Sequence, residues 1–167
     1  WFRLLVITVI GIVQDVAFVW ITYDVAYYYF SSSVATAVPI VGGITMMVVG
    51  IVFGIFFAHK LSRKTATTFS YGLLVVLWGV LWAYEAITGS VSGLPLMALM
   101  TILFLPTELT WGTRAMLTPE LFRTETRGTY VSIVRTIVWV ATGLITLALS
   151  YYVFPFNVSS AIVMAIF

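Results

Sequence analysis

The chain has 167 residues, of which 62% are hydrophobic and only 8% are charged. A soluble domain carries about 25% charged and about 45–50% apolar residues, and one of this size could not hide so much apolar surface from water. The composition therefore excludes a soluble enzyme. It also excludes a nucleic-acid-binding domain, because eight basic against six acidic residues do not form a phosphate-binding patch. We expect an integral membrane protein in contact with the lipid bilayer, with no nucleic-acid partner.

The sequence gives no sign of a cofactor, a metal site or an enzyme. The chain contains no Cys and a single His, which excludes disulfides, thiolate ligands and an all-histidine metal site built within it. It contains no glycine-rich nucleotide-binding motif and no Lys within an apolar run. We therefore expect no ATP-driven chemistry, no retinal Schiff base and no catalytic residues.

Apolar runs, each long enough to cross a bilayer, alternate with short polar breaks. Crossing the hydrocarbon core takes about 20 residues in a helix, and a helix satisfies its own backbone hydrogen bonds in lipid. The pattern predicts an all-α, multi-pass transmembrane bundle that forms one unit over residues 1–167. Because the last run stops short of a full span, we expect the chain to be part of a longer polypeptide. The predicted spans are 4–29, 35–58, 67–87, 95–117, 129–152 and an incomplete one over 156–167.

The basic residues near span ends predict the orientation of the bundle. They precede the first span or lie in the second-to-third and fourth-to-fifth breaks, whereas the other breaks contain no Lys or Arg. Cytoplasmic loops carry an excess of Lys and Arg. We therefore expect a cell-membrane protein with residue 1 on the cytoplasmic side. The basic residues in question are Arg3, Lys60, Arg63, Lys64, Arg123 and Arg127.

The second span carries small residues at helical spacing. Gly50, Gly54 and Ala58 recur every four residues and therefore share one helix face. Small side chains allow another backbone to approach closely. We expect this face to pack inside the bundle.

Ionisable residues within spans are candidates for function, because burying a charge in lipid is costly. Asp15, beside Gln14, lies nearest the middle of a span and is the best candidate for a proton or substrate site; the alternative is an Asp satisfied by a neighbouring helix. Asp24 lies nearer the outer end of the same span, where it can face water. The two carboxyls lie on opposite faces of a helix, which disfavours two-carboxylate hydrolysis.

Three further ionisable residues lie in the fourth and fifth spans. Glu108 closely follows Pro106, and a proline within a helix bends it and can open a cavity beside the carboxyl. Arg114 is too far round the helix to pair with Glu108, so it needs a partner elsewhere or extends to the cytoplasmic interface. Arg135 either contacts a substrate or serves packing and gating.

Two breaks resemble motifs of the major facilitator superfamily. In that family the second-to-third loop reads Asp-Arg-x-Gly-Arg-Arg/Lys after a glycine-rich helix end. The segment 54–64 matches it at Lys60, Arg63 and Lys64 but has His59 in place of the Asp and Ser62 in place of the Gly.

The fourth-to-fifth break is similar to the family's Glu-x-x-Pro-x-x-x-Arg-Gly element. Glu120, Arg127 and Gly128 stand at the right spacing, and Arg123 stands where Pro is usual. Both motifs lie at the expected ends of the expected spans. The residues of the two motifs resemble those of the sugar-porter-like and metabolite:H+ symporter branches. They resemble one six-helix half of such a transporter, the carboxyl-terminal half.

The resemblance implies secondary active transport of a small solute by alternating access, coupled to protons. The solute would be a sugar, an organic acid or an inorganic anion, bound near the bilayer midplane between this bundle and the other six-helix half. The alternative is a non-transporting subunit of a larger membrane complex, such as a respiratory assembly; a channel is a weaker rival. The residues we assign to the substrate and proton pathway are Gln14, Asp15, Glu108 and Arg135, and those we assign to a cytoplasmic gate are Arg63, Lys64, Glu120 and Arg127.

Overall fold

The computed structural model of the protein describes residues 2–88 and 94–152, which form helices joined by short turns. The incomplete span predicted over 156–167 lies outside the described residues. The elements in chain order are α1 (Phe2–Val19), the π-helical segment η1 (Trp20–Val25), α2 (Ala26–Tyr29), α3 (Ser32–Phe56), α4 (Arg63–Thr88), α5 (Leu94–Glu120) and α6 (Arg127–Tyr152).

Five helical segments of 23 to 27 residues are long and apolar enough to cross a membrane. They correspond in order to the five complete spans predicted from the sequence, so the all-α, multi-pass membrane class is confirmed. Their bounds differ by a few residues, because the ends of the helices include polar residues beyond the apolar runs. Thus α4 begins at Arg63 rather than near 67, and α5 continues to Glu120 rather than ending near 117.

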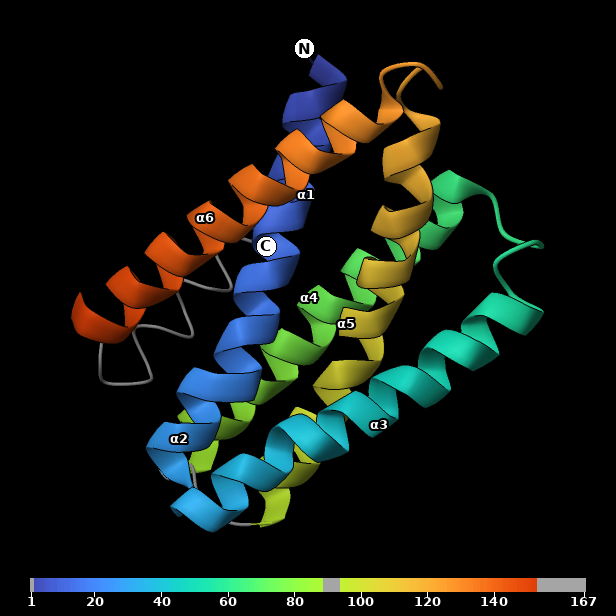
Figure 1. Ribbon diagram of the computed structural model, residues 1–167. Helices are drawn as coiled ribbons and strands as arrows, with labels where there is room; N and C mark the ends of the chain where they lie inside the picture. Colours follow the sequence, from blue (N-terminus) through green and yellow to red (C-terminus); the bar gives the residue numbers. More distant parts are fainter. Residues whose placement is uncertain (1, 89–93, 153–167) are drawn as a thin grey trace.

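The helix α5 is central to the bundle and packs against α1, α3 and α4, while α6 packs mainly along α1 (Figure 1). The start of α1 lies toward the same end of the bundle as the α3–α4 and α5–α6 linkers (Figure 1). A hydrogen bond from Arg3 Nη1 to the carbonyl of Leu121, 3.3 Å long, joins two of these segments. We call this end, which holds the linkers 57–62 and 121–126, the basic end.

The core of the bundle is apolar and aromatic. The rings of Trp20 and Trp78 stack with centroids 5.9 Å apart, and Phe18 packs edge-on against Phe104 and Trp111. Most side chains that face outward from α3 and α6 are large and hydrophobic. Exposed apolar faces of this extent are expected where lipid, not water, surrounds the helices.

A row of threonines lines the buried side of α5. Thr107, Thr110 and Thr113 are at most 1% exposed, and each donates its hydroxyl hydrogen to a carbonyl of its own helix. A buried hydroxyl without a partner would be costly in this environment. The helix α5 therefore buries these polar side chains without needing partners from its neighbours.

Two glycines of α3 let α5 approach closely. A Cβ at Gly42 would overlap the ring of Phe104, and one at Gly50 would lie 2.7 Å from Glu108 Oε1. At Gly54, by contrast, a Cβ would meet nothing within 4 Å. The close approach predicted for the second span therefore exists, but the face that makes it contains Gly42 and Gly50 and leaves out Gly54.

The first span is not a uniform α-helix. The segment η1 interrupts it over Trp20–Val25, one turn after Asp15. A π-turn is a rare element that often lies near functional sites. The apolar run over 4–29 gave no sign of it.

Candidate functional site

Asp15 of α1 and Arg114 of α5 form an ion pair inside the bundle. Arg114 Nη2 lies 3.1 Å from Asp15 Oδ1 and donates a hydrogen bond to it. The side chain of Asp15 is 1% exposed and that of Arg114 is 13% exposed. The guanidinium also stands over the ring of Trp111, 5.3 Å from its centroid, in a cation–π contact. Arg114 therefore points into the bundle and does not extend from the helix end to the membrane surface.

Gly11 makes room for this pair. It lies one helical turn before Asp15 on the same face of α1, and it is buried. A Cβ at this position would collide with Arg114 Nη1 and would lie 2.7 Å from a methyl group of Val138. A glycine here lets both the guanidinium and α6 lie directly against the backbone of α1.

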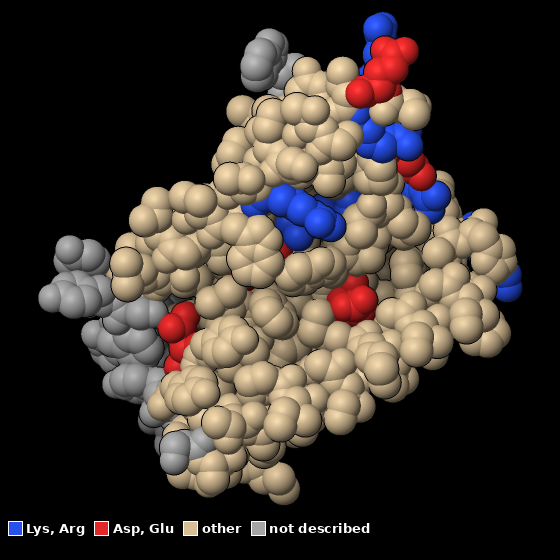
Figure 2. Space-filling view, in the orientation of Figure 1, with Lys and Arg blue, Asp and Glu red and all other residues tan. Residues whose placement is uncertain are grey.

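A cavity of about 770 Å³ lies beside the ion pair, between α1, α5 and α6. It extends from Asp15 toward residues at the basic end, including Thr124 and Arg127. On the face drawn in Figure 2, a patch of Lys and Arg atoms lies amid largely uncharged surface, apart from the charges at the end of the bundle. The charged and aromatic residues that line the cavity are Asp15, Trp111, Arg114, Arg127, Arg135 and Trp139.

Two arginines of α6 line this cavity without a carboxylate partner. Arg127 and Arg135 form no ion pair with any residue in 2–88 or 94–152. Arg127 Nε is buried and has no hydrogen-bond acceptor among those residues. The cavity wall therefore contains three arginines and one aspartate, and that aspartate is already paired with Arg114.

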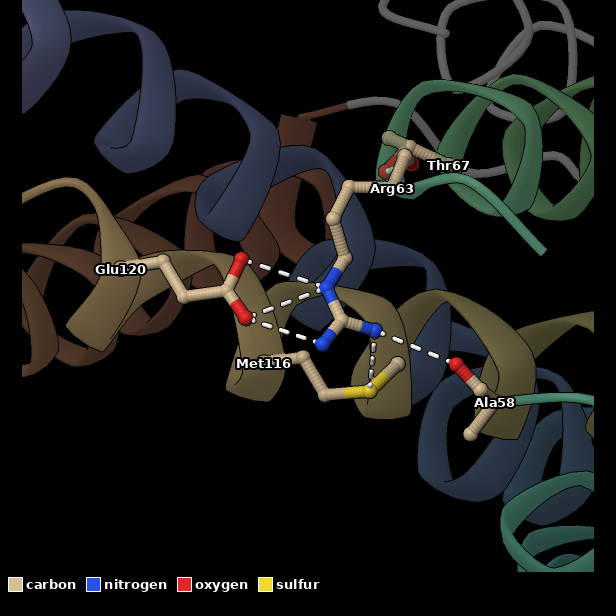
Figure 3. Close-up of polar contacts among 5 residues, drawn as sticks. All are labelled: Ala58, Arg63, Thr67, Met116 and Glu120. Carbon is tan, nitrogen blue, oxygen red and sulfur yellow. Dashed lines mark hydrogen bonds and ion pairs between the residues drawn. The ribbon is translucent and has the colours of Figure 1, made fainter. Parts of the chain in front are cut away.

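A second ion pair joins α4 to α5 at the basic end. Arg63 Nη2 lies 2.9 Å from Glu120 Oε1, and Arg63 Nε donates to both carboxylate oxygens, as Figure 3 shows. Arg63 Nη1 donates to the carbonyl of Ala58 and contacts the sulfur of Met116, each at 3.3 Å. The two side chains are 42% and 48% exposed. The guanidinium thus connects the end of α5 to the α3–α4 linker.

The four residues that the sequence assigned to a gate do not form one cluster. Arg63 and Glu120 are paired, whereas Lys64 is exposed and takes part in neither ion pair of the described residues. Arg127 faces the cavity between α1, α5 and α6. The structure therefore divides this set between the Arg63–Glu120 pair and the cavity.

The four residues assigned to the substrate and proton pathway are also divided. Asp15 and Arg135 line the cavity. Gln14 is fully buried, does not line the cavity, and its amide N and O atoms have no hydrogen-bond partner among the described residues. Glu108 lies across from Gly50, on the α3 side of α5, and also lies outside the cavity lining.

The sequence pattern does not identify Arg114 as the partner of Asp15 and leaves both residues without a defined partner. The only sequence signal was that each needed an opposite charge from another helix. Pairing them requires knowing that α1 packs against α5. Gly11, which lies one helical turn from Asp15, was a weaker indication that another helix packs close to this carboxyl.

In comparisons with known proteins, no family model, no curated protein and no solved structure matches the chain.

Proposed function

We propose that the chain is one half of a secondary active transporter of the major facilitator type. The solute moves by alternating access between this bundle and a second six-helix bundle, and the basic end faces the cytoplasm of a cell. The observation that supports this most is the Asp15–Arg114 ion pair, which lies deep in the bundle beside a cavity large enough for a small molecule.

The chemistry of the pair supports proton coupling. A buried charge pair is costly to maintain, and its retention within a membrane span points to use in function. When a solute engages Arg114, Asp15 loses its counter-charge, and a proton from water then neutralises the carboxylate. Solute and proton therefore occupy the site together, and both leave when the ion pair re-forms.

The Arg63–Glu120 pair supports a change between two states. It joins helix ends at the basic end through partly exposed side chains. Exposed pairs are worth about 0.2–1 kcal/mol, which is too little to hold the fold together but enough to shift a two-state population several-fold. Its role in transport is to favour the state in which the cytoplasmic side is closed.

The test is proton flux in vesicles that contain the full-length protein and an internal pH-sensitive dye. Sugars, organic acids and inorganic anions are added outside one class at a time, under an inward proton gradient. We expect one class to acidify the interior and to accumulate against its own gradient. If no class does either, and the protein co-purifies with other membrane subunits, the non-transporting subunit is the better assignment.

A further inference from the structure

We infer that the cavity between α1, α5 and α6 binds an organic anion. The arginines of α6 hold its acidic group, and Trp111 and Trp139 contact its apolar part. This inference rests on the proposed function in that it names the substrate class of the same site.

The charge of the cavity wall excludes a cation and disfavours a neutral solute. Asp15 is paired with Arg114, so the charges of Arg127 and Arg135 remain without a carboxylate partner within 2–88 and 94–152. Charges in a membrane bundle need compensation. A carboxylate or phosphate group is the complement of a guanidinium, because it accepts two parallel hydrogen bonds from the planar fork.

Arg127 supplies an independent sign that an acceptor belongs in the cavity. Its Nε is buried from solvent and has no acceptor in the described residues. Leaving a buried charged donor without an acceptor costs more than leaving a neutral donor without one. An anionic group bound in the cavity would remove this penalty.

The size and lining of the cavity point to an organic molecule. A volume of about 770 Å³ lies within the range of about 300–1,000 Å³ of small-molecule pockets, and far exceeds what one inorganic ion fills. Trp111 and Trp139 offer aromatic surface, and Val131 and Val138 line the same wall. Arg135 lies two helical turns beyond Arg127, about 12 Å deeper along α6. The solute therefore meets Arg127 near the basic end before it reaches Arg135 and the ion pair.

The experiment measures binding by calorimetry to the full-length protein in phosphatidylcholine nanodiscs. The probes are benzoate and indole-3-acetate, each compared with its uncharged amide, and inorganic phosphate. We expect the two carboxylates to bind at least tenfold more tightly than their amides and than phosphate. Equal affinity for carboxylates and amides would overturn the inference, as would tighter binding of phosphate.

Arginine variants identify the site. Arg135→Gln and Arg127→Gln should each weaken carboxylate binding roughly tenfold, the size expected for one charged hydrogen bond. Arg135→Lys keeps the charge and should retain part of the affinity. The matched control is Arg123→Gln, which removes the same charge from the exposed α5–α6 linker outside the cavity lining. An equal loss in Arg123→Gln would mean that general surface charge attracts the probes, and would overturn the inference.

Two further measurements complete the test. The first distinguishes a solute from a lipid headgroup, and the second distinguishes the inference from the proposed function. Nanodiscs with added phosphatidylglycerol test a lipid headgroup: if that lipid stabilises the protein through Arg127 and Arg135 while neither carboxylate binds, the inference is wrong. Proton flux separates the inference from the proposed function. Carboxylate binding without any solute-driven flux contradicts transport alone, whereas proton-coupled uptake of a neutral solute without carboxylate binding contradicts the organic anion alone.

Discussion

Asp15 and Arg114 are 99 residues apart in the sequence, yet their side chains meet at 3.1 Å inside the bundle. The pair ties the last turns of α1 to the second half of α5, and the cavity opens directly beside it. Removing one partner of a buried pair leaves a charge without compensation, which is far more costly than removing both. The pair therefore allows two separate tests, one of proton-coupled transport and one of the stability of the bundle.

The first prediction concerns coupling. Asp15→Asn preserves the shape of the side chain and removes the group that takes up the proton. In vesicles with the full-length protein, we expect it to abolish uphill uptake while solute exchange continues. Asp24→Asn, the same change in the same span but outside the cavity lining, is the matched control and should keep uphill uptake. Uphill uptake by Asp15→Asn at the wild-type rate would assign Asp15 a structural role and make Glu108 the next candidate.

The second prediction concerns the stability of the pair. Arg114→Gln and Asp15→Asn should each destabilise the bundle by roughly 3 kcal/mol, because each leaves the other group unpaired. The double variant should cost clearly less than the sum of the two, with a coupling energy of at least about 1 kcal/mol. Denaturant unfolding in detergent measures all three. Additive costs would mean that the two side chains do not act on each other.

Much of the fold could be predicted from the sequence because lipid imposes strong constraints. A run of about 20 apolar residues in a bilayer must be a helix, so the order of five spans followed from hydropathy alone. The placement of the α3–α4 and α5–α6 linkers at one end followed from the order of the spans, because two crossings return the chain to the same side. Helix packing could not be predicted, because every span is apolar on most of its surface and no periodic pattern says which faces meet.

The third prediction concerns the Arg63–Glu120 pair. Arg63→Glu and Glu120→Arg should each shift the population of the two transport states by up to about fivefold and change the free energy of unfolding by no more than about 1 kcal/mol. The charge-swapped double variant should restore the wild-type population. These 167 residues contain no Cys. Once any Cys elsewhere in the full-length protein is replaced, Ala115→Cys in the cavity wall gives a specific site for a maleimide label, whose reaction rate reports access.

An unchanged labelling rate in both single variants would mean that this pair does not influence the states. A swap that fails to restore the rate would mean that Arg63 acts through its contacts with Ala58 and Met116 instead.

The fourth prediction concerns the contact between α3 and α5. Gly42→Ala would drive a methyl group into the ring of Phe104, a fully buried side chain, and should destabilise the bundle by about 1–3 kcal/mol. The neighbouring Gly43→Ala meets nothing within 4 Å and should be neutral or slightly stabilising, because alanine favours helix. Thermal unfolding of the two variants checks this. Similar melting temperatures would mean that α3 moves away from α5 without cost.

The candidate site was only partly predictable, and the reason differs by residue. Asp15 and Arg135 were identified because a charge within a span is rare and costly. Their grouping around one cavity depends on how α1, α5 and α6 cross, which no sequence spacing specifies. Gln14 adjoins Asp15 in the sequence, but adjacent helical residues point about 100° apart, so it is buried outside the cavity lining.

The segment η1 divides the first span into two helical halves, and it sets the rotation of one half about the helix axis relative to the other. A π-turn contains one residue more than an α-turn, so the same residues wound as ordinary α-helix over Trp20–Val25 would rotate the two halves relative to each other by about 100°. With Val25 and Ala26 held in the core, the first half would turn as a unit and carry Asp15 away from Arg114. The π-turn therefore decides whether the carboxyl faces its partner, and its conversion to α-helix would disconnect the pair while every side chain that forms it remained present.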